Sequence, residues 1–413
     1  MLKLFMVIKM NKNLKRFLKY VKIDTQSDEL SNTIPSTLKQ LDLANVLYQE
    51  LLDLNVLCSI SEDGIIMGEI PSNIDKDVPV IGFLAHMDTA MDLTGKNVNP
   101  KIIENYNLED IKLNEEYTLS KNDYHSLNNK LGHTLITTSG NTLLGADDKA
   151  GITIIMGLID YLLEHKEFKH GKVKFAFTID EEIGRGTDTF DIEKFGCDYA
   201  YTVDGGNPNE VEYECFNAAS CNVEIKGVSI HTGSAKGIMI NSQHLAMEFF
   251  NKLPKELDPS LTSGYEGFNH LHSIEGEVEL TKMSFLIRNH DKELFNKQKL
   301  DFINAQEYIN KKYNKELCKV TIKDTYSNMK DYLDNKMYVV DIAYNALKNV
   351  GLNPISNPIR GGTDGARLTM LGLPCPNLGT GGYNFHGRYE YLSLNELEKM
   401  IDVLKEIVKL SCN

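Results

Sequence analysis

Five side chains of the types that bind zinc lie far apart in this chain, each in a short segment of unusual character. They are His86 in GFLAHMDTA, Asp147 in LLGADDKAG, Glu182 in TIDEEIGRG, Asp204 in YTVDGG and His386 in YNFHGRYEY. Each lies beside a strand-like apolar run or a Gly-rich turn, where a solvated charge is least expected. Two imidazoles and three carboxylates without a thiolate suit borderline ions such as Zn²⁺, with Mn²⁺ or Co²⁺ as alternatives. The residue types therefore predict a metal-dependent hydrolase.

Two of these segments hold a second candidate at a useful spacing. His86 and Asp88 follow a predicted strand two residues apart, so both side chains project to the same side. Asp88 could then accept from the second ring N–H of a metal-bound His86. Glu181 and Glu182 are adjacent at a strand end, so one can bind metal while the other faces a substrate. Alone, the first pattern is also typical of a hydrogen-bonded turn, and the second of a solvated acidic turn.

The other three segments have ordinary explanations as well. Asp147 and Asp148 precede an amphipathic helix, where either could be an N-cap. Asp204 precedes Gly-Gly and could be a turn former. His386, between Phe385 and Gly387, could be a packed histidine. The metal site is therefore predicted from the joint occurrence of all the segments.

The apolar runs at 78–85, 173–179 and 199–203 predict the strands that position these side chains. All three are continuously apolar, as expected for strands covered on both faces. A helix-like segment at 151–165 separates the first two, which indicates a strand–helix–strand unit with parallel strands. Binding groups gather beyond the carboxyl ends of strands in open α/β sheets, so the candidates following these strands should meet at one edge.

The pattern predicts a mixed-sheet α/β domain with an inserted α+β domain. Ser36 is expected to cap a helix that runs to about Leu54. After Gly206, alternating strands at 221–230 and 277–288 are accompanied by helical segments near 241–252 and 291–312. We expect the following boundaries: a catalytic domain at 1–214 and 328–413, and an inserted domain at 215–327.

Composition excludes several classes of partner. A net charge of −14 disfavours nucleic acids and anionic membrane surfaces. The seven cysteines are odd in number and never spaced as CxxC, which favours a reducing cytoplasm over a disulfide framework. No apolar run is long enough to span a bilayer. Residues 1–9 precede a second methionine, Met10, and we interpret them as an upstream-start extension.

Several stretches together resemble a known family, namely LLGADDKAGI, DEEIGRG, RGGTDGARL and FHGRYE. The chain is similar to the cocatalytic-zinc metallopeptidases, which include carboxypeptidase G, the aminoacylases and succinyl-diaminopimelate desuccinylase. The resemblance is greatest to the branch that acts as tripeptide aminopeptidases. It implies a catalytic domain of zinc-peptidase-like α/β/α architecture and an inserted domain that serves as a lid and in dimerisation, so a homodimer is possible.

The resemblance also implies a role for each candidate ligand. Two zinc ions per subunit would be bound, the first by His86 and Asp204 and the second by Glu182 and His386. Asp147 would bridge them, because relatives keep an aspartate at this first position of the Asp-Asp pair.

The resemblance further implies the groups that act around these ions. Asp88 would orient His86, and Glu181 would be the general base for the attacking water.

The residues expected to bind the peptide are less firmly indicated. By the same resemblance, His231 would stabilise the oxyanion that develops on the substrate carbonyl. Arg288 and Arg360 carry guanidinium groups that match a substrate carboxylate, and either could instead form structural ion pairs. Asn241 and Asn384 are expected to contact the substrate backbone.

Two alternatives to the tripeptide aminopeptidase stay open. The chain could be a dizinc N-deacylase or carboxypeptidase of the same family, for which the substrate needs no free α-amine. It could also be a metal-bearing peptide-binding protein without catalysis, although Glu181, the expected base, is present.

Overall fold

The computed structural model describes residues 11–412, so the extension expected at residues 1–9 lies outside the described residues. The chain forms two compact units, and each is described by itself. The first unit comprises the residues up to Tyr213 together with Tyr332–Ser356 and the residues from Thr363 onward. The second comprises Glu214–Asp331 and Asn357–Gly362. The insertion expected at 215–327 falls within the second unit.

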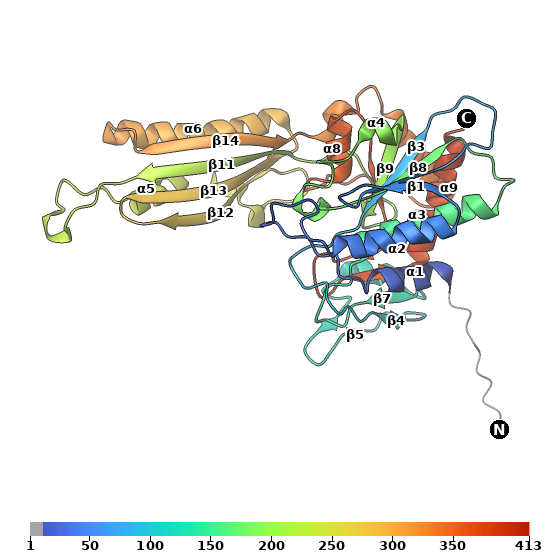
Figure 1. The fold of residues 1–413 in the computed structure, drawn as a ribbon. Helices are drawn as coiled ribbons and strands as arrows, with labels where there is room; N and C mark the ends of the chain where they lie inside the picture. Colours follow the sequence, from blue (N-terminus) through green and yellow to red (C-terminus); the bar gives the residue numbers. More distant parts are fainter. Residues whose placement is uncertain (1–10, 413) are drawn as a thin grey trace. The chain divides into compact units, whose positions relative to one another are not determined.

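A seven-stranded mixed sheet forms the centre of the first unit (Figure 1), in the order β1-β2-β8-β3-β9-β15-β10. The neighbours β8, β3, β9 and β15 are parallel, whereas β1, β2 and β10 join in antiparallel pairs. The sheet confirms the predicted mixed α/β class and the three predicted interior strands. The bounds of the strands are Leu57–Ile60 (β1), Ile66–Ile70 (β2), Ile81–His86 (β3), Val173–Thr178 (β8), Tyr199–Gly205 (β9), Val211–Glu212 (β10) and Asn377–Gly379 (β15).

Helices cover this sheet because its central strands are apolar on both faces. All six residues of β3 are buried, and α3 packs across β3 and β9. This helix lies between β3 and β8 in the chain and confirms the predicted strand–helix–strand unit. The helices of the unit are Lys12–Tyr20 (α1), Gln40–Asp53 (α2), Ala146–Glu164 (α3), Ile192–Phe195 (α4), Tyr338–Asn349 (α7), Asp364–Met370 (α8) and Leu394–Leu410 (α9).

The predicted cap of the second helix is wrong. The helix begins at Gln40, after Lys39, and Ser36 does not cap it. Instead the backbone N–H and the hydroxyl of Ser36 both donate to the buried carboxylate of Asp180, at 2.7 and 2.5 Å. The hydroxyl oxygen, which a local cap would use as an acceptor, instead accepts from the backbone N–H of Asp28 at 3.0 Å.

A smaller sheet with the order β16-β17-β7-β4 extends the first unit. With the β5–β6 pair it encloses a separate apolar cluster around Tyr106, Leu127 and Tyr391. The bounds are Lys101–Ile103 (β4), Ile111–Lys112 (β5), Thr118–Leu119 (β6), Leu135–Thr137 (β7), Gly382–Tyr383 (β16) and Tyr391–Ser393 (β17).

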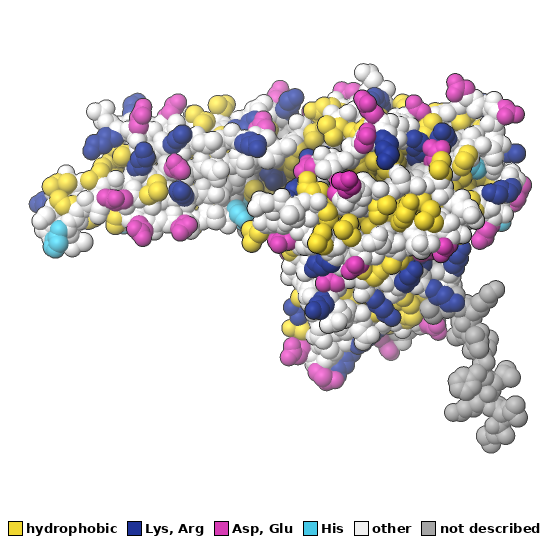
Figure 2. All heavy atoms as spheres, in the orientation of Figure 1, with side chains coloured by type: hydrophobic (Ala, Val, Ile, Leu, Met, Phe, Trp, Pro, Cys, Tyr) yellow, Lys and Arg dark blue, Asp and Glu magenta, His cyan; other side chains and the backbone are white. Residues whose placement is uncertain are grey.

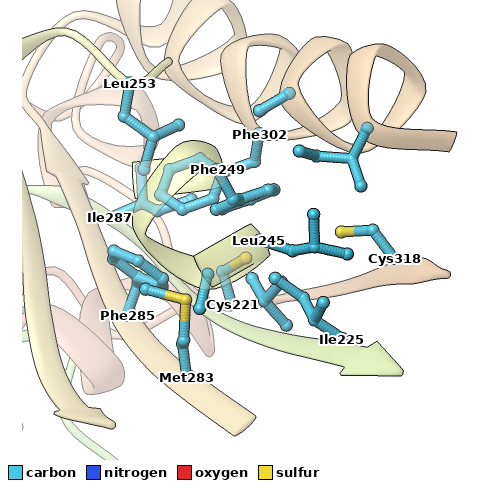
Figure 3. Packing of buried hydrophobic residues seen from close by; sticks show 14 of the residues in the cluster. Cys221, Ile225, Leu245, Phe249, Leu253, Met283, Phe285, Ile287, Phe302 and Cys318 are labelled. Atoms are coloured by element: carbon cyan, nitrogen blue, oxygen red, sulfur yellow. The ribbon is translucent and has the colours of Figure 1, made fainter. Parts of the chain in front are cut away.

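The second unit is a four-stranded antiparallel sheet, β12-β13-β11-β14, with helices α5 and α6 packed on it. Strand β11 alternates buried and exposed residues over its second half, as expected for a sheet with one covered face. Figure 3 shows Leu245 and Phe249 of α5 against Phe285 of β13 and Phe302 of α6. The bounds are Asn217–Lys226 (β11), Phe268–Gly276 (β12), Leu280–Asn289 (β13), Cys318–Tyr326 (β14), Ser242–Phe250 (α5) and Lys292–Tyr313 (α6).

The surface carries charges of both signs. Figure 2 shows acidic and basic side chains interspersed on the displayed face, without a continuous basic patch there. Among residues 11–412, no helix is long and apolar enough to cross a membrane.

Candidate active site

The carboxyl ends of three parallel strands bring the candidate ligands of the first unit together. His86 is the last residue of β3, and Asp204 is near the end of β9. Glu182 lies just beyond β8, in the short 3-10 helix Glu181–Ile183. Asp147 lies at the start of α3, where its φ and ψ of −82° and 105° are not helical. His386 comes from the turn between β16 and β17 and has a left-handed φ of 62°.

The five side chains form two pairs that share one carboxylate. His86 Nε2 lies 2.9 Å from Asp147 Oδ1 and 3.3 Å from Asp204 Oδ1. His386 Nε2 lies 3.3 Å from Asp147 Oδ2 and 3.0 Å from Glu182 Oε2. We call His86 with Asp204 the His86 pair, and His386 with Glu182 the His386 pair. Each oxygen of Asp147 faces one pair, which is the arrangement a bridging ligand requires.

Asp148 competes with Asp147 for the role of ligand. Within the described part of the chain, metal-binding atoms converge in two groups of three residues: His86, Asp148 and Asp204, and His86, Asp147 and Glu182. However, Asp148 accepts from backbone N–H groups through both oxygens, from His86 at 3.2 Å and from Gly151 at 3.1 Å. Asp147 instead directs its oxygens at the two imidazoles, which favours Asp147 over Asp148 for the bridging position.

Buried like charges indicate that cations belong at this site. Burial, reinforced by the charge of Asp147, raises the pKa of Glu182 to about 7, and burial raises that of Asp204 to about 7. Glu182 Oε1 is buried without a hydrogen-bond partner in the described structure. Three carboxylates at such close range repel one another unless positive charge lies between them. The residues present therefore fit two divalent cations that share Asp147.

The imidazoles are held in a strongly acidic environment. Hydrogen bonds with Asp147 and Glu182 raise the pKa of His386 to about 11. Burial lowers the pKa of His86, but the attraction of Asp204 and Asp147 outweighs it and the net shift is upward. In the absence of metal, imidazolium groups would balance the carboxylates. Binding of cations would release these protons, so metal affinity should rise with pH.

The comparisons with known proteins agree with this geometry. The sequence model of peptidase family M20/M25/M40 matches residues 143–410 of this chain. The chain belongs to this family. It is 54% identical to Peptidase T of Clostridium perfringens (strain 13 / Type A) over 402 residues, which cover 97% of this chain and 99% of that protein. The resemblance to the cocatalytic-zinc metallopeptidases is thereby confirmed.

Solved structures confirm the fold. Aminopeptidase PepT from Bacillus cereus ATCC 10987 superposes with a TM-score of 0.77 at 22% identity and covers 97% of this chain and 98% of that chain. A tripeptidase from Staphylococcus aureus subsp. aureus mu50 gives 0.76 at 20% identity, with the same coverage. At such identities the likeness establishes the fold alone.

Asp88 connects the two pairs of this M20-family site. It is fully buried, and its two oxygens accept from the backbone N–H groups of Glu181 at 3.0 Å and Glu182 at 3.1 Å. His86 Nδ1 lies 3.3 Å from Asp88 Oδ1, although the main-chain oxygen of Asp88 is nearer at 3.1 Å. One aspartate therefore contacts a histidine of one pair and the backbone of a residue of the other.

The expected base, Glu181, lines a small pocket beside the His86 pair. The pocket is also lined by Thr178 and Asp364. Burial raises the pKa of Glu181 well above its usual range, and the charges of Asp204 and Asp364 add to the shift. Thr178 Oγ1 donates to Asp364 Oδ2 at 2.9 Å. Asp364 was not among the predicted residues, although it lies in the quoted RGGTDGARL stretch.

Three further residues hold ligands in place and were not predicted. Asn377 Oδ1 accepts from the backbone N–H of Asp204 at 3.1 Å. Asp92 Oδ2 lies 3.4 Å from His386 Nδ1, opposite the nitrogen that faces the other carboxylates. Glu390 accepts from backbone N–H groups around Asp147. Acidic residues and asparagines are common in any chain, so only the folded contacts reveal these roles.

One residue expected to bind substrate belongs to the first unit. Asn384 has a left-handed φ of 57° and lies in the same turn as His386. Its Nδ2 donates to the main-chain oxygen of Tyr389 at 3.0 Å. This contact shapes the turn that presents His386.

Two of the other expected residues have local roles in the second unit. His231 is exposed, and its Nδ1 accepts from the N–H of Gly233 at 3.1 Å. Asn241 caps α5 by accepting from the N–H of Gln243 at 2.9 Å.

The two arginines of the second unit differ in how fully their guanidinium groups are engaged. Arg288 Nη1 donates to the main-chain oxygens of Ala219 and Ile287, at 3.1 and 3.0 Å. Arg360 donates from both terminal nitrogens to the 262–266 loop, and its guanidinium lies 5.2 Å from the ring centre of Phe216. A bidentate contact of Arg360 with a substrate carboxylate would therefore have to replace some of these contacts.

Proposed function

We propose that this chain is a dizinc aminopeptidase that releases the N-terminal residue from tripeptides. The observation that carries the proposal is the Asp147 carboxylate, whose two oxygens face His86 and His386 at 2.9 and 3.3 Å. The identity to Peptidase T of Clostridium perfringens over nearly the whole of both chains supports the choice of peptide substrate. The similar structure from Staphylococcus aureus is that of a tripeptidase, which supports the choice of substrate length.

Zinc is the proposed metal because the ligands are two imidazoles and three carboxylates. His86 and Asp204 would hold one ion, Glu182 and His386 the other, and Asp147 would contact both. When bound, the ions would act as Lewis acids that polarise the peptide carbonyl and acidify the attacking water.

Glu181 is the proposed proton carrier. Its raised pKa suits a carboxylate that accepts a proton from water and later donates it to the leaving amine. Asp88 accepts a hydrogen bond from the backbone N–H of Glu181 at 3.0 Å, which would hold the proposed base in a constant position relative to the neighbouring Glu182. Such positioning lowers the barrier because the reacting groups need no further ordering.

Substrate length would be sensed through the C-terminal carboxylate of the peptide. Two residues beyond the scissile bond span roughly 7 Å when extended, so a fixed guanidinium could act as a gauge. Arg288 and Arg360 are proposed for this role, Asn241 and Asn384 for the peptide backbone, and His231 for the developing oxyanion. The second unit would then serve as a lid, and the homodimer implied by the resemblance is proposed with it.

The proposed compartment is the cytoplasm. The seven cysteines form no disulfide in the described part of the chain, and burial raises the pKa of thiols such as Cys215 and Cys318 to about 12. These thiols are therefore poor nucleophiles and have packing roles.

The test is the release of a free amino acid from an unblocked tripeptide, beside its N-acetylated form and the matching dipeptide and tetrapeptide. Cleavage of the free tripeptide alone, abolished by a chelator and restored by zinc, is the expected result. Cleavage of the acetylated peptide would instead assign the chain to the deacylase or carboxypeptidase branch. Activity that persists after complete metal removal would contradict the metal centre.

A further inference from the structure

A single buried carboxylate accepts hydrogen bonds from the backbone N–H groups at the N-terminus of helix α3. Glu390 is 1% exposed. Its Oε2 accepts from the N–H groups of Leu144 at 2.5 Å and Gly145 at 2.9 Å. Its Oε1 accepts from those of Ala146 at 2.6 Å and Asp147 at 3.2 Å. A carboxylate in its ionised form is purely an acceptor, and these donors match its lone pairs.

This contact replaces a local helix cap. The N-cap of α3 is Gly145, which has a φ of 80° and no side chain that could accept from the first turn. The first N–H groups of a helix lack internal partners and need acceptors from elsewhere. Glu390, more than 240 residues along the chain, supplies this acceptor.

The anchored segment carries the shared carboxylate of the metal centre. Asp147 has non-helical φ and ψ, so the helix itself does not fix the direction of its side chain. Its N–H is one of the groups that Glu390 holds. Glu390 also follows His386 by four residues and donates its own N–H to the oxygen of Gly387 at 3.2 Å. One side chain thus joins the segment of His386 to the segment of Asp147.

We propose that Glu390 is a positioning residue that sets Asp147 between the His86 pair and the His386 pair, so that its carboxylate is required for tight binding of both cations. It touches neither the substrate nor the cations, and acts through the backbone of Asp147. The inference rests on the proposed metal centre. It is independent of which peptide is cleaved.

The variant Glu390→Gln distinguishes a role of Glu390 in positioning Asp147 from a role in packing alone. Glutamine has the same size, but its one oxygen can serve about half of the donors, and its NH₂ group faces the others. We expect zinc affinity to fall about 10- to 100-fold, as for other residues that orient ligands without touching the metal. With zinc saturating, we expect kcat to fall while KM stays within about twofold, because substrate contacts are unchanged.

Asp160→Asn is the matched control, because Asp160 lies on the same helix but far from Asp147. It is 7% exposed and accepts from Arg16 at 2.8 Å, with Lys12 Nζ at 2.7 Å. Loss of this buried interaction should lower the melting temperature while leaving zinc affinity within about twofold of wild type, since no ligand is near.

The measurement is zinc affinity and stoichiometry by competition with a chromophoric chelator, on metal-free protein without substrate. Weaker binding in Glu390→Gln but not in Asp160→Asn supports the inference. Equal affinity of wild type and Glu390→Gln, or an equal loss in both variants, overturns it. A wild-type chain that takes up no zinc overturns the proposed function and this inference with it. If Glu390→Gln does not fold, Glu390→Asp replaces it, since the shorter carboxylate keeps its charge but reaches fewer donors; wild-type affinity there also overturns the inference.

Discussion

Replacement of Asp88 by asparagine should weaken the binding of both cations and slow catalysis together. Asp88 is fully buried and accepts from the N–H groups of Glu181 and Glu182, at 3.0 and 3.1 Å. Its carboxylate also lies 3.3 Å from His86 Nδ1. The substitution keeps the size and shape of the side chain, so the effect comes from the loss of charge and of one acceptor.

The size of the effect follows from these contacts. Asparagine has one acceptor oxygen, so one of the two N–H groups must face its NH₂ group. A hydrogen bond to a charged group contributes about 1.5–3 kcal/mol, and a buried donor without a partner costs about 1–3 kcal/mol. Part of this loss is relieved by relaxation, and we take a total of about 2–4 kcal/mol. At about 1.36 kcal/mol per factor of ten, kcat/KM should fall roughly 30- to 1,000-fold.

The assay is kcat/KM for a free tripeptide at saturating zinc, together with zinc affinity measured without substrate. The matched control is Asp198→Asn. Asp198 accepts from the N–H of Val80 at 2.7 Å, just before β3, at the end of the strand opposite His86. It should keep kcat/KM and zinc affinity within about twofold of wild type.

Two results would refute the reasoning. Asp88→Asn with kcat/KM within threefold of wild type would show that the backbone of Glu181 and Glu182 needs no anchor. An equal loss in Asp198→Asn would show that the effect is general destabilisation of the strand.

Three further measurements address the base, the order of metal loss and the dependence of stability on pH. Glu181→Gln should keep zinc affinity within a few-fold and lose about 10²- to 10⁴-fold in kcat, and a wild-type kcat would exclude Glu181 as the base. His386 has 46% of its side chain exposed against 2% for His86, so a chelator should remove zinc in two phases, and His386→Ala should retain about one ion; a single phase would contradict this asymmetry. Burial raises the pKa of Glu212 from 4.5 to about 7, so the folded chain holds this proton more tightly and stability falls as pH rises from 4.5 to 7. In denaturant unfolding, Glu212→Gln should be about 1–2 kcal/mol more stable than wild type at pH 8, a value reduced because Glu212 is partly exposed to solvent. Near pH 4.5 the two proteins should be equally stable. A stability difference that does not change with pH would contradict the raised pKa of Glu212.

The central part of the fold was predictable because its signals are local. The continuous apolar runs that became β3, β8 and β9 are typical of strands buried on both faces, and all three are parallel neighbours. Their carboxyl ends fix where His86, Glu182 and Asp204 must lie. The convergence of these side chains therefore follows from strand order and general sheet geometry.

The rest depends on contacts between distant parts of the chain. Ser36 has the residue type of a helix cap, but its hydroxyl oxygen accepts from the N–H of Asp28 while its hydroxyl and N–H donate to Asp180, so the local pattern gave the wrong cap. Arg360 has the residue type of a carboxylate clamp, and its contacts with the 262–266 loop and the Phe216 ring within the second unit could not be predicted from that type. In both cases the contacts of an ordinary polar side chain depend on residues that are distant in the sequence.

Four of the five candidate ligands share a feature that residue types alone could not indicate. The backbone N–H of His86 donates to Asp148, and that of Asp147 donates to Glu390. The N–H of Glu182 donates to Asp88, and that of Asp204 donates to Asn377.

Each of these ligands is therefore held by its main chain as well as by its place on a strand or helix. Main-chain anchoring fixes the direction of a short side chain before any cation arrives, which reduces the ordering that binding must impose. It also keeps three mutually repelling carboxylates together, because relaxation away from one another would break hydrogen bonds in the buried interior. The acidic residues of this site thus divide into those that face the metal centre and those that hold the backbone. Asp147 and Asp148 show that adjacent residues of one type can take the two different roles.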